Sequence, residues 1–305
     1  MRPLTDRTAK PALPVLNEPL IVRTLRALKR AGVTEVMVNL HHRPDTVRAA
    51  IPEDLGLKVR YSREAVILGT GGALRKMRSF VGRHPFLVVN GDVVFDFDLA
   101  AIVASHRLTG ALATLALKPN SNPSLYKPVV TNRAGRILSI RGVPSGQRGS
   151  VSLFASVHVI DPVILDRLPP GESDTVGDLY IPLLREGAHL QGVRQSGLWY
   201  DLGSPAGYLK AQTRLLAARG GRRSVLVDSS VRVGKGARLT RSVVGAGSVI
   251  EPLARVDGSV IWDGALVKAG ARLRQCIVMS GTEVPSGTWT NLVLGPKTRT
   301  VIGRE

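Results

Sequence analysis

The feature that most constrains the fold is a short repeat in the C-terminal part of the chain. From Val233 onward, an aliphatic residue recurs about every six positions, with small residues between. The positions are Val233 in VGKGAR, Val244 in VGAGSV, Val249, Val256, Val267 in VKAGAR and Ile277. This spacing suits a coil with three short faces, each of which places one aliphatic side chain inside and turns at glycine or alanine.

The repeat resembles the hexapeptide repeat that forms a left-handed parallel β-helix. A small β-sandwich is the alternative, but its strands would be longer and would alternate in polarity. Acyltransferases built on this helix commonly use a catalytic histidine, and no histidine of this chain lies beyond His189. We therefore expect the segment to serve packing or oligomerisation and to make the protein a homo-oligomer.

Between Pro19 and Leu209, helical patterns alternate with short apolar strands. The expected helix and strand pairs are residues 20–31 with 35–40, 46–50 with 58–61, and 71–80 with 86–89. Repeated helix-then-strand units with buried-looking strands predict a Rossmann-like α/β domain with a mostly parallel sheet.

A change of pattern marks the boundary between the two regions. The expected helix at 205–218 is followed by RGGRR, where paired glycines and charge interrupt the periodicity. A chain of 305 residues also suits one large domain plus a smaller one. We predict an α/β domain at residues 1–221 and a β-helix domain at residues 222–305.

The formal charge of +19 favours anionic partners, among them nucleotides, sugar phosphates, nucleic acids and acidic lipids. Scattered arginines and an aromatic content of 4% argue against nucleic acid. No uncharged run is long enough to span a bilayer, so we expect no membrane partner. Cys276 is the only cysteine, which excludes an internal disulfide and suits a reducing cytoplasm.

Four motifs resemble, in their order along the chain, the signature segments of the nucleotide-sugar pyrophosphorylases, or sugar-phosphate nucleotidyltransferases. They are RPLTDRTAKPALPVLNEPLI from Arg2, ILGTGGAL from Ile67, VVNGDVVFD from Val88 and WYDLGSPAGYLKA from Trp199. Each motif alone is a weak signal, but the four motifs together make the resemblance specific. Together with the hexapeptide repeat, these motifs most resemble those of mannose-1-phosphate guanylyltransferase-like proteins. The resemblance implies an enzyme that uses Mg²⁺ to join an NTP to a sugar 1-phosphate.

Nucleotidyl transfer needs the triphosphate charge neutralised and the attacking phosphate held in line with the α-phosphorus. The resemblance places Lys10 and Arg2 beside the phosphates as catalytic residues. Lys10 could instead be a solvated loop lysine, and Arg2 could lie in a frayed terminus.

Asp92 follows the apolar strand FLVVN through Asn90 and Gly91, at the strand end where α/β sheets bind ligands. A carboxylate there suits Mg²⁺, and the resemblance makes Asp92 catalytic and Asp201 the second metal ligand. Asp201 could instead close a turn before the Ser204-Pro205 helix start. We expect Asp96 and Asp98 to be turn or capping groups.

The glycine-rich segment Gly69, Thr70, Gly71 and Gly72 would allow close approach of a base and ribose, unless it is a plain capped loop. The resemblance places Glu64 and the Asn90-Gly91 pair near the nucleotide. A carboxylate at Glu64 can accept from guanine's two N–H donors or from a uracil imide, which inclines the expectation toward GTP.

The family's Glu-Lys-Pro triplet on the sugar side is absent, and the corresponding region reads ILSIRGVP. Arg141 is expected to substitute in binding the sugar phosphate. The resemblance makes Glu172 and Asp178, in GESDTVGDLYIPLL, possible sugar contacts, although both could be solvated helix-start acids.

The family's first strand and Gly-rich phosphate loop should lie immediately before Arg2, where this sequence has only Met1. We expect a start codon upstream that restores this loop, or a catalytically inactive copy. The intact downstream motifs favour the first.

The expected function is GDP-mannose synthesis from GTP and mannose 1-phosphate with release of pyrophosphate. Alternatives are uridylyl or thymidylyl transfer to another sugar phosphate, or an inactive paralogue that binds nucleotide sugars and regulates a partner.

Overall fold

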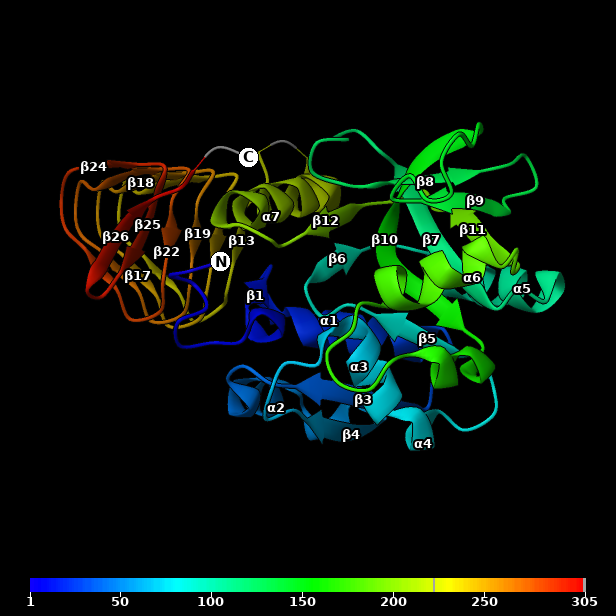
Figure 1. Cartoon of the computed structure of the whole chain (residues 1–305). Coiled ribbons are helices and arrows are strands. Elements are labelled where there is room, and N and C mark those ends of the chain that lie inside the picture. The colour runs from blue at the N-terminus through cyan, green and yellow to red at the C-terminus, as the bar shows by residue number, and fades with distance from the viewer. Residues whose placement is uncertain (222, 304–305) are drawn as a thin grey trace. The chain divides into compact units, whose positions relative to one another are not determined.

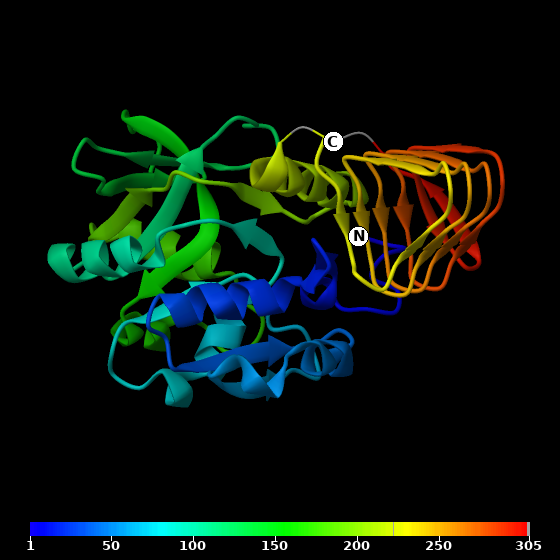
Figure 2. The same ribbon diagram turned by 180° about the vertical axis from the view of Figure 1, so that it is seen from behind.

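The computed structural model describes residues 1–221 and 223–303 (Figures 1 and 2). By contacts the chain forms two compact units. The sheet unit is Thr24–Pro44 with Glu53–Trp199, and the β-helix unit is Met1–Arg23, Asp45–Pro52 and Tyr200–Glu305. The predicted boundary after residue 221 stays a prediction. Residues 222, 304 and 305, with which the predicted second domain begins and ends, lie outside the described residues.

The sheet unit is built around a mixed six-stranded sheet. Its strands are β5 (Phe86–Val89), β7 (Ala113–Pro119), β8 (Pro128–Thr131), β9 (Ile137–Ile140), β10 (Ser150–Ile160) and β11 (Leu190–Arg194). β7 and β11 are parallel, whereas β10 runs antiparallel to β5, β7 and β8. The α/β class is confirmed, with more antiparallel pairing than predicted, because β8, β9 and β10 follow one another without intervening helices.

The other strands of the first 201 residues lie outside this sheet. They are β1 (Pro14–Val15), β2 (Glu18–Pro19), β3 (Glu35–Leu40), β4 (Lys58–Arg63), β6 (Val93–Phe95) and β12 (Trp199–Asp201). β3 and β4 form a separate two-stranded parallel sheet.

The helices are α1 (Leu20–Arg30), α2 (Pro44–Ala50), α3 (Gly69–Lys76), α4 (Arg78–Val81), α5 (Leu99–Thr109), α6 (Ile181–Arg185) and α7 (Pro205–Gly220). The sequence supplies side-chain caps for two of the helices, α5 and α7. Asp98 caps α5 by accepting from the N–H of Ala101 at 3.0 Å, which confirms its predicted capping role. Ser204 caps α7 in the same way, accepting from the N–H of Gly207 at 3.0 Å.

The C-terminal part is a parallel β-helix, as predicted. Figure 1 shows its coils, and Figure 2 shows them from behind. Stacked residues lie 17 positions apart, as with Ser242 and Ser259. The strands are β13 (Leu226–Val227), β14 (Arg232–Val233), β15 (Arg238–Thr240), β16 (Val243–Val244), β17 (Val249–Ile250), β18 (Arg255–Asp257), β19 (Val260–Ile261), β20 (Leu266–Val267), β21 (Arg272–Arg274), β22 (Ile277–Val278), β23 (Glu283–Val284), β24 (Thr288–Thr290), β25 (Leu292–Gly295) and β26 (Thr298–Val301).

The β-helix core follows the repeat with small shifts. Val244, Val256 and Val267 are core residues, as predicted. The prediction differs at three positions. In the interior cluster Ile250 takes the place of Val249, and Val278 takes that of Ile277, although Ile277 is itself fully buried; Val233 on the first coil is 49% exposed. Strand side chains alternate in direction, so an error of one residue exchanges the inner and outer faces.

The corners explain the small residues of the repeat. One corner column consists of Gly247, Gly264 and Gly281, whose φ angles are 66°, 67° and 65°. Glycine adopts this left-handed conformation without steric cost. At this corner the turns fall at glycines, in line with the prediction of turns at glycine or alanine. At other corners Arg241, Leu253, Gln275 and Asn291 adopt the left-handed conformation.

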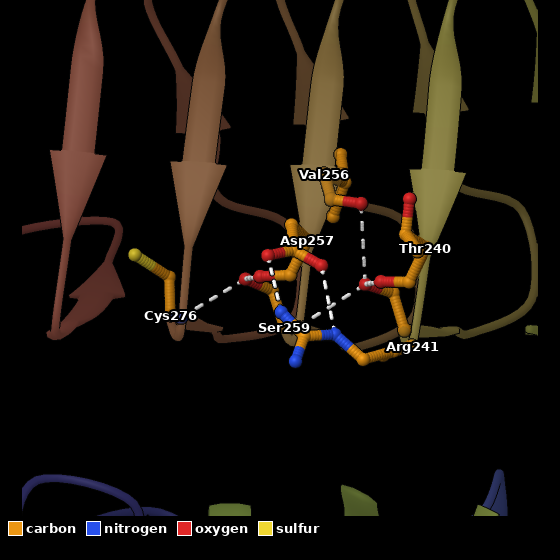
Figure 3. A network of polar contacts seen from close by, with 7 residues as sticks. Thr240, Arg241, Val256, Asp257, Ser259 and Cys276 are labelled. Atoms are coloured by element: carbon orange, nitrogen blue, oxygen red, sulfur yellow. Dashed lines mark hydrogen bonds and ion pairs between the residues drawn. The ribbon is translucent and has the colours of Figure 1, made fainter. Parts of the chain in front are cut away.

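A column of buried serine and cysteine side chains runs beside another corner of the β-helix (Figure 3). The N–H of Ser259 donates to Ser242 Oγ at 3.1 Å, and the N–H of Cys276 donates to Ser259 Oγ at 2.9 Å. Ser259 Oγ donates in turn to the carbonyl of Asp257 at 2.9 Å. Burial raises the pKa of the Cys276 thiol, which disfavours the reactive thiolate. These hydrogen bonds satisfy buried N–H groups that coil stacking leaves unpaired.

Replacing Ser259 with alanine should lower the free energy of unfolding by about 1–3 kcal/mol, because the buried N–H of Cys276 loses its acceptor. Cys276→Ser is the matched control: serine already occupies this column twice, so the change should be below about 0.5 kcal/mol. Urea unfolding measures both. Equal stability of the two variants would contradict this account of the column.

Candidate active site

The predicted site residues divide between the two units. Arg2, Lys10 and Asp201 belong to the β-helix unit, and the others belong to the sheet unit. Lys10 begins a single 3₁₀ turn, Lys10–Ala12. The side chain of Arg2 is 88% exposed, with Nε 3.5 Å from Asp6 Oδ1.

The glycine-rich segment packs directly on the loop that carries Glu172. The N–H of Gly71 donates to the carbonyl of Ser173 at 2.8 Å, and the N–H of Ser173 donates to the carbonyl of Leu68 at 2.9 Å. A Cβ at Gly69 would collide with the Ser173 carbonyl, and one at Gly72 with the Gly171 carbonyl. Packing against this loop is therefore enough to explain why glycine occupies these positions. Their contact with a nucleotide stays a prediction.

Asp174, which the sequence analysis did not single out, joins several predicted residues. Its Oδ2 lies 2.5 Å from Nη1 of Arg141, and its Oδ1 accepts from the hydroxyl of Thr70 at 3.4 Å. The N–H groups of Val176 and Gly177 also donate to this carboxylate. Burial alone would raise the pKa of Asp174, but the hydrogen bond from Arg141 and those from the backbone outweigh it and hold the pKa below its usual value.

Asp178 takes a capping role. Its Oδ2 accepts from the N–H of Asp174 at 2.7 Å, at the start of the π-helix Thr175–Tyr180. This is the helix-start role that the sequence analysis held as the alternative. Glu172 is exposed on the same loop. Sugar contacts by Glu172 and Asp178 stay predictions.

Glu64 is a buried carboxylate with spare acceptor capacity. It is 5% exposed, and its Oε2 accepts from the N–H of Leu68 at 3.1 Å. Its Oε1 is buried and has no hydrogen-bond partner within the part of the chain that the structure describes. An unpaired buried acceptor costs free energy, so this oxygen is suited to a ligand's N–H.

A β-bulge in β10 positions the segment of Asp92. The register against β7 shifts between Phe154 and His158, and Ser156 within the bulge has a φ of 60°. The N–H of Asn90, two residues before Asp92, donates to the carbonyl of Ser156 at 3.0 Å. Bulges of this kind often lie beside active sites, where they redirect a chain or side chain.

The same bulge also binds Trp199, two residues before Asp201. Trp199 Nε1 donates to the carbonyl of Ala155 at 2.9 Å, and its ring packs edge-on to Tyr126 with centroids 5.3 Å apart. One bulge therefore fixes the chain just ahead of each predicted metal ligand.

Asp92 and Asp201 fit Mg²⁺ in donor chemistry, because both offer partly exposed hard carboxylate oxygens. Mg²⁺ is commonly held by one or two carboxylates together with substrate phosphates. Across residues 1–221 and 223–303, no three His, Cys, Asp or Glu side chains gather into a metal cluster. That Asp92 and Asp201 hold Mg²⁺ stays a prediction.

The charge of Asp174 should stabilise the fold at neutral pH but not in acid. Its pKa is lowered on folding, so its contribution is present above the unfolded pKa and is lost as pH falls through the folded pKa. Asp174→Asn should cost up to about 1 kcal/mol at pH 7, since the pair with Arg141 is partly exposed.

That cost should shrink as pH falls below the unfolded pKa and should vanish once the carboxyl is protonated in the folded protein. Urea unfolding at a series of pH values from 7 downward measures it. Asp166→Asn, which removes the 3.3 Å contact of the exposed Asp166 with Arg78, is the control and should have little effect across the series. A difference between Asp174→Asn and wild type that stays the same from pH 7 into acid would contradict an electrostatic role.

Two family models match the chain. Residues 1–218 match the nucleotidyl transferase family, and residues 211–291 match the GlmU-like C-terminal hexapeptide family. The fold is therefore a Rossmann-like domain followed by a left-handed parallel β-helix. No helix among the described residues has the length and apolar character needed to cross a bilayer.

The chain is also similar to proteins that are named as nucleotidyltransferases acting on sugar 1-phosphates. The mannose-1-phosphate guanylyltransferase of Mycobacterium tuberculosis is 30% identical over 85% of this chain and 75% of the relative. The mannose-1-phosphate guanylyltransferase catalytic subunit beta of Dictyostelium discoideum is 31% identical, over 68% of this chain and 59% of the relative. A UTP–glucose-1-phosphate uridylyltransferase of Synechocystis is 30% identical, over 69% and 59%.

The chain thus spans 59% of the length of the Dictyostelium and Synechocystis relatives. Its own match to the nucleotidyl transferase model nevertheless runs through the whole region ahead of the β-helix. This chain belongs to the nucleotidyl transferase family.

Proposed function

We propose that this protein transfers a nucleoside monophosphate from an NTP to a sugar 1-phosphate, forming an NDP-sugar and pyrophosphate. The observation that carries the proposal is the family match over residues 1–218, which includes all the predicted site residues. The relatives named above act on sugar 1-phosphates, according to their names.

The proposed reaction needs no protein nucleophile. An oxygen of the sugar phosphate attacks the α-phosphorus, a new P–O bond forms, and the bond to the β-phosphate bridging oxygen breaks as pyrophosphate leaves. Lys10 and Arg2 would neutralise phosphate charge, which favours the approach of two anions. Asp92 and Asp201 would hold Mg²⁺, which when bound supplies further charge neutralisation at the phosphates.

The proposed base is guanine, and Glu64 supports it. Its buried Oε1 lacks a partner in the described structure, and a carboxylate can accept from the adjacent N–H donors of guanine. The relatives named for mannose 1-phosphate guanylyl transfer point the same way. The uridylyltransferase relative favours a second candidate, uridylyl transfer to glucose 1-phosphate.

On the sugar side, Arg141 is the proposed phosphate ligand. The hydrogen bond to Asp174 fixes the direction of the guanidinium, and the carboxylate leaves other N–H donors of Arg141 for a phosphate. Glu172 remains a proposed sugar contact. A homo-oligomer assembled through the β-helix and a cytoplasmic location are also proposals.

The proposal predicts pyrophosphate release when purified protein is mixed with Mg²⁺, GTP and mannose 1-phosphate, measured across four NTPs and several sugar 1-phosphates. GTP with mannose 1-phosphate should be the fastest pair. Asp92→Asn should lower the rate about a hundredfold or more, because several kcal/mol of charge stabilisation at the phosphates are lost.

The exposed neighbour Asp96 supplies the control, since Asp96→Asn should keep the rate within about twofold. Absence of turnover with every pair would reject the activity. Full activity of Asp92→Asn would reject the metal assignment alone.

A further inference from the structure

One face of the β-helix carries a column of arginines. Arg238 of β15 pairs in register with Arg255 of β18, and Arg255 pairs with Arg272 of β21. Neighbouring strands lie about 4.8 Å apart, so the three residues stand one above another on consecutive coils. We name Arg238, Arg255 and Arg272 the arginine column. Its next position is Thr288 of β24.

The column faces outward. Each arginine precedes a residue of the β-helix interior, and successive strand residues point to opposite faces. These interior residues are Leu239, Val256 and Leu273. All three arginines are exposed, and Arg274, two positions after Arg272, stands exposed on the same outer face.

Among the described residues, the arginine column has no counter-ion of its own. None of its three guanidinium groups forms an ion pair within residues 1–221 and 223–303, whereas Arg241 and Lys268 of the β-helix are paired. Asp257 stands on the same face, in register with Arg274. Its carboxylate is occupied by Arg241, with contacts of 2.5 and 3.0 Å (Figure 3).

Like charges directly opposite one another on neighbouring strands destabilise a sheet. The arginine column therefore costs free energy in the isolated chain, and an external anion would relieve it. We propose that the arginine column is a docking surface for an extended acidic segment of a partner protein. This inference is independent of the proposed transferase activity.

Carboxylates match the chemistry of the column, because each guanidinium can donate two parallel hydrogen bonds to one carboxylate. Two strand spacings span about 10 Å, the length of about three residues of extended chain. A short run of Asp and Glu residues would thus reach all three arginines. Leu253, which is 68% exposed two residues before Arg255, adds an apolar contact that a peptide side chain can use.

Other polyanions fit this face less well. The outward positions of β15, β18 and β21 carry arginine, threonine and aspartate, with no aromatic ring on which a base could stack. Membrane-binding basic clusters commonly contain 4–8 cations, usually as flexible segments or amphipathic helices. A rigid column of three arginines favours a protein ligand.

The test measures fluorescence anisotropy of a labelled peptide of six glutamates and one leucine, titrated with the full-length protein at low and moderate salt. Replacing Arg238, Arg255 and Arg272 together with threonine, the residue of the fourth position, should weaken binding at least tenfold. Arg232→Thr, which removes an exposed arginine of β14 outside the column, should change it less than twofold.

Thermal unfolding shows whether a substitution that weakens peptide binding has also destabilised the fold. Arg255→Thr should keep or raise the Tm, because it removes repulsion from both neighbours. Three outcomes would overturn the proposal: no binding of the peptide, equal weakening by Arg232→Thr and Arg255→Thr, or a lowered Tm for Arg255→Thr. Tighter column-dependent binding of a uridine hexanucleotide, or of phosphatidylcholine vesicles with 30% phosphatidylserine, would replace the protein partner with that class.

Discussion

The close contact between the start of α3 and the loop at Gly171–Ser173 is the constraint on which the candidate site depends. Two backbone hydrogen bonds join the segments, and glycines allow the carbonyls of Gly171 and Ser173 to approach. Asp174 then adds an ion pair to Arg141 and a hydrogen bond from Thr70. The proposed nucleotide and sugar sides are thereby held as one rigid group, which suits a reaction between two bound phosphates.

The β10 bulge plays a similar part for the segments that carry the two proposed metal ligands. It accepts hydrogen bonds from Asn90 and from Trp199, so one irregular strand fixes two segments that lie far apart in sequence. Ser156 adopts a left-handed φ of 60° that costs a non-glycine residue free energy. Such strain persists only where neighbouring contacts hold it, as these two do.

Local patterns predicted much of the fold from sequence. The β-helix could be predicted because each coil encloses aliphatic residues at regular spacing and many corners are glycine. Helices α1, α2 and α7 agree with their predicted ranges to within two residues at each end. The antiparallel course of β10 was missed, since strand direction is set by long-range pairing that helix-then-strand alternation does not encode.

The site was predicted less completely, for a similar reason. Asp174 is linked to Arg141 and Thr70 over separations of 33 and 104 residues, which no local spacing reveals. Its one local signal is the SDTVGD sequence at a helix start. The glycines of GTGG were predicted to contact a nucleotide, which stays a prediction, whereas their packing against Gly171 and Ser173 could not be inferred from the sequence. The arginine column likewise became visible only with the strand register.

We propose that Asp92 and Asp201 hold one divalent ion together. Electron paramagnetic resonance of Mn²⁺ with GTP measures this directly, without any turnover. The account predicts one bound Mn²⁺ per chain, with Asp92→Asn and Asp201→Asn each weakening it about tenfold or more and the double variant losing little further. Two independent sites, each lost with one aspartate, or unchanged binding in either variant, would contradict it.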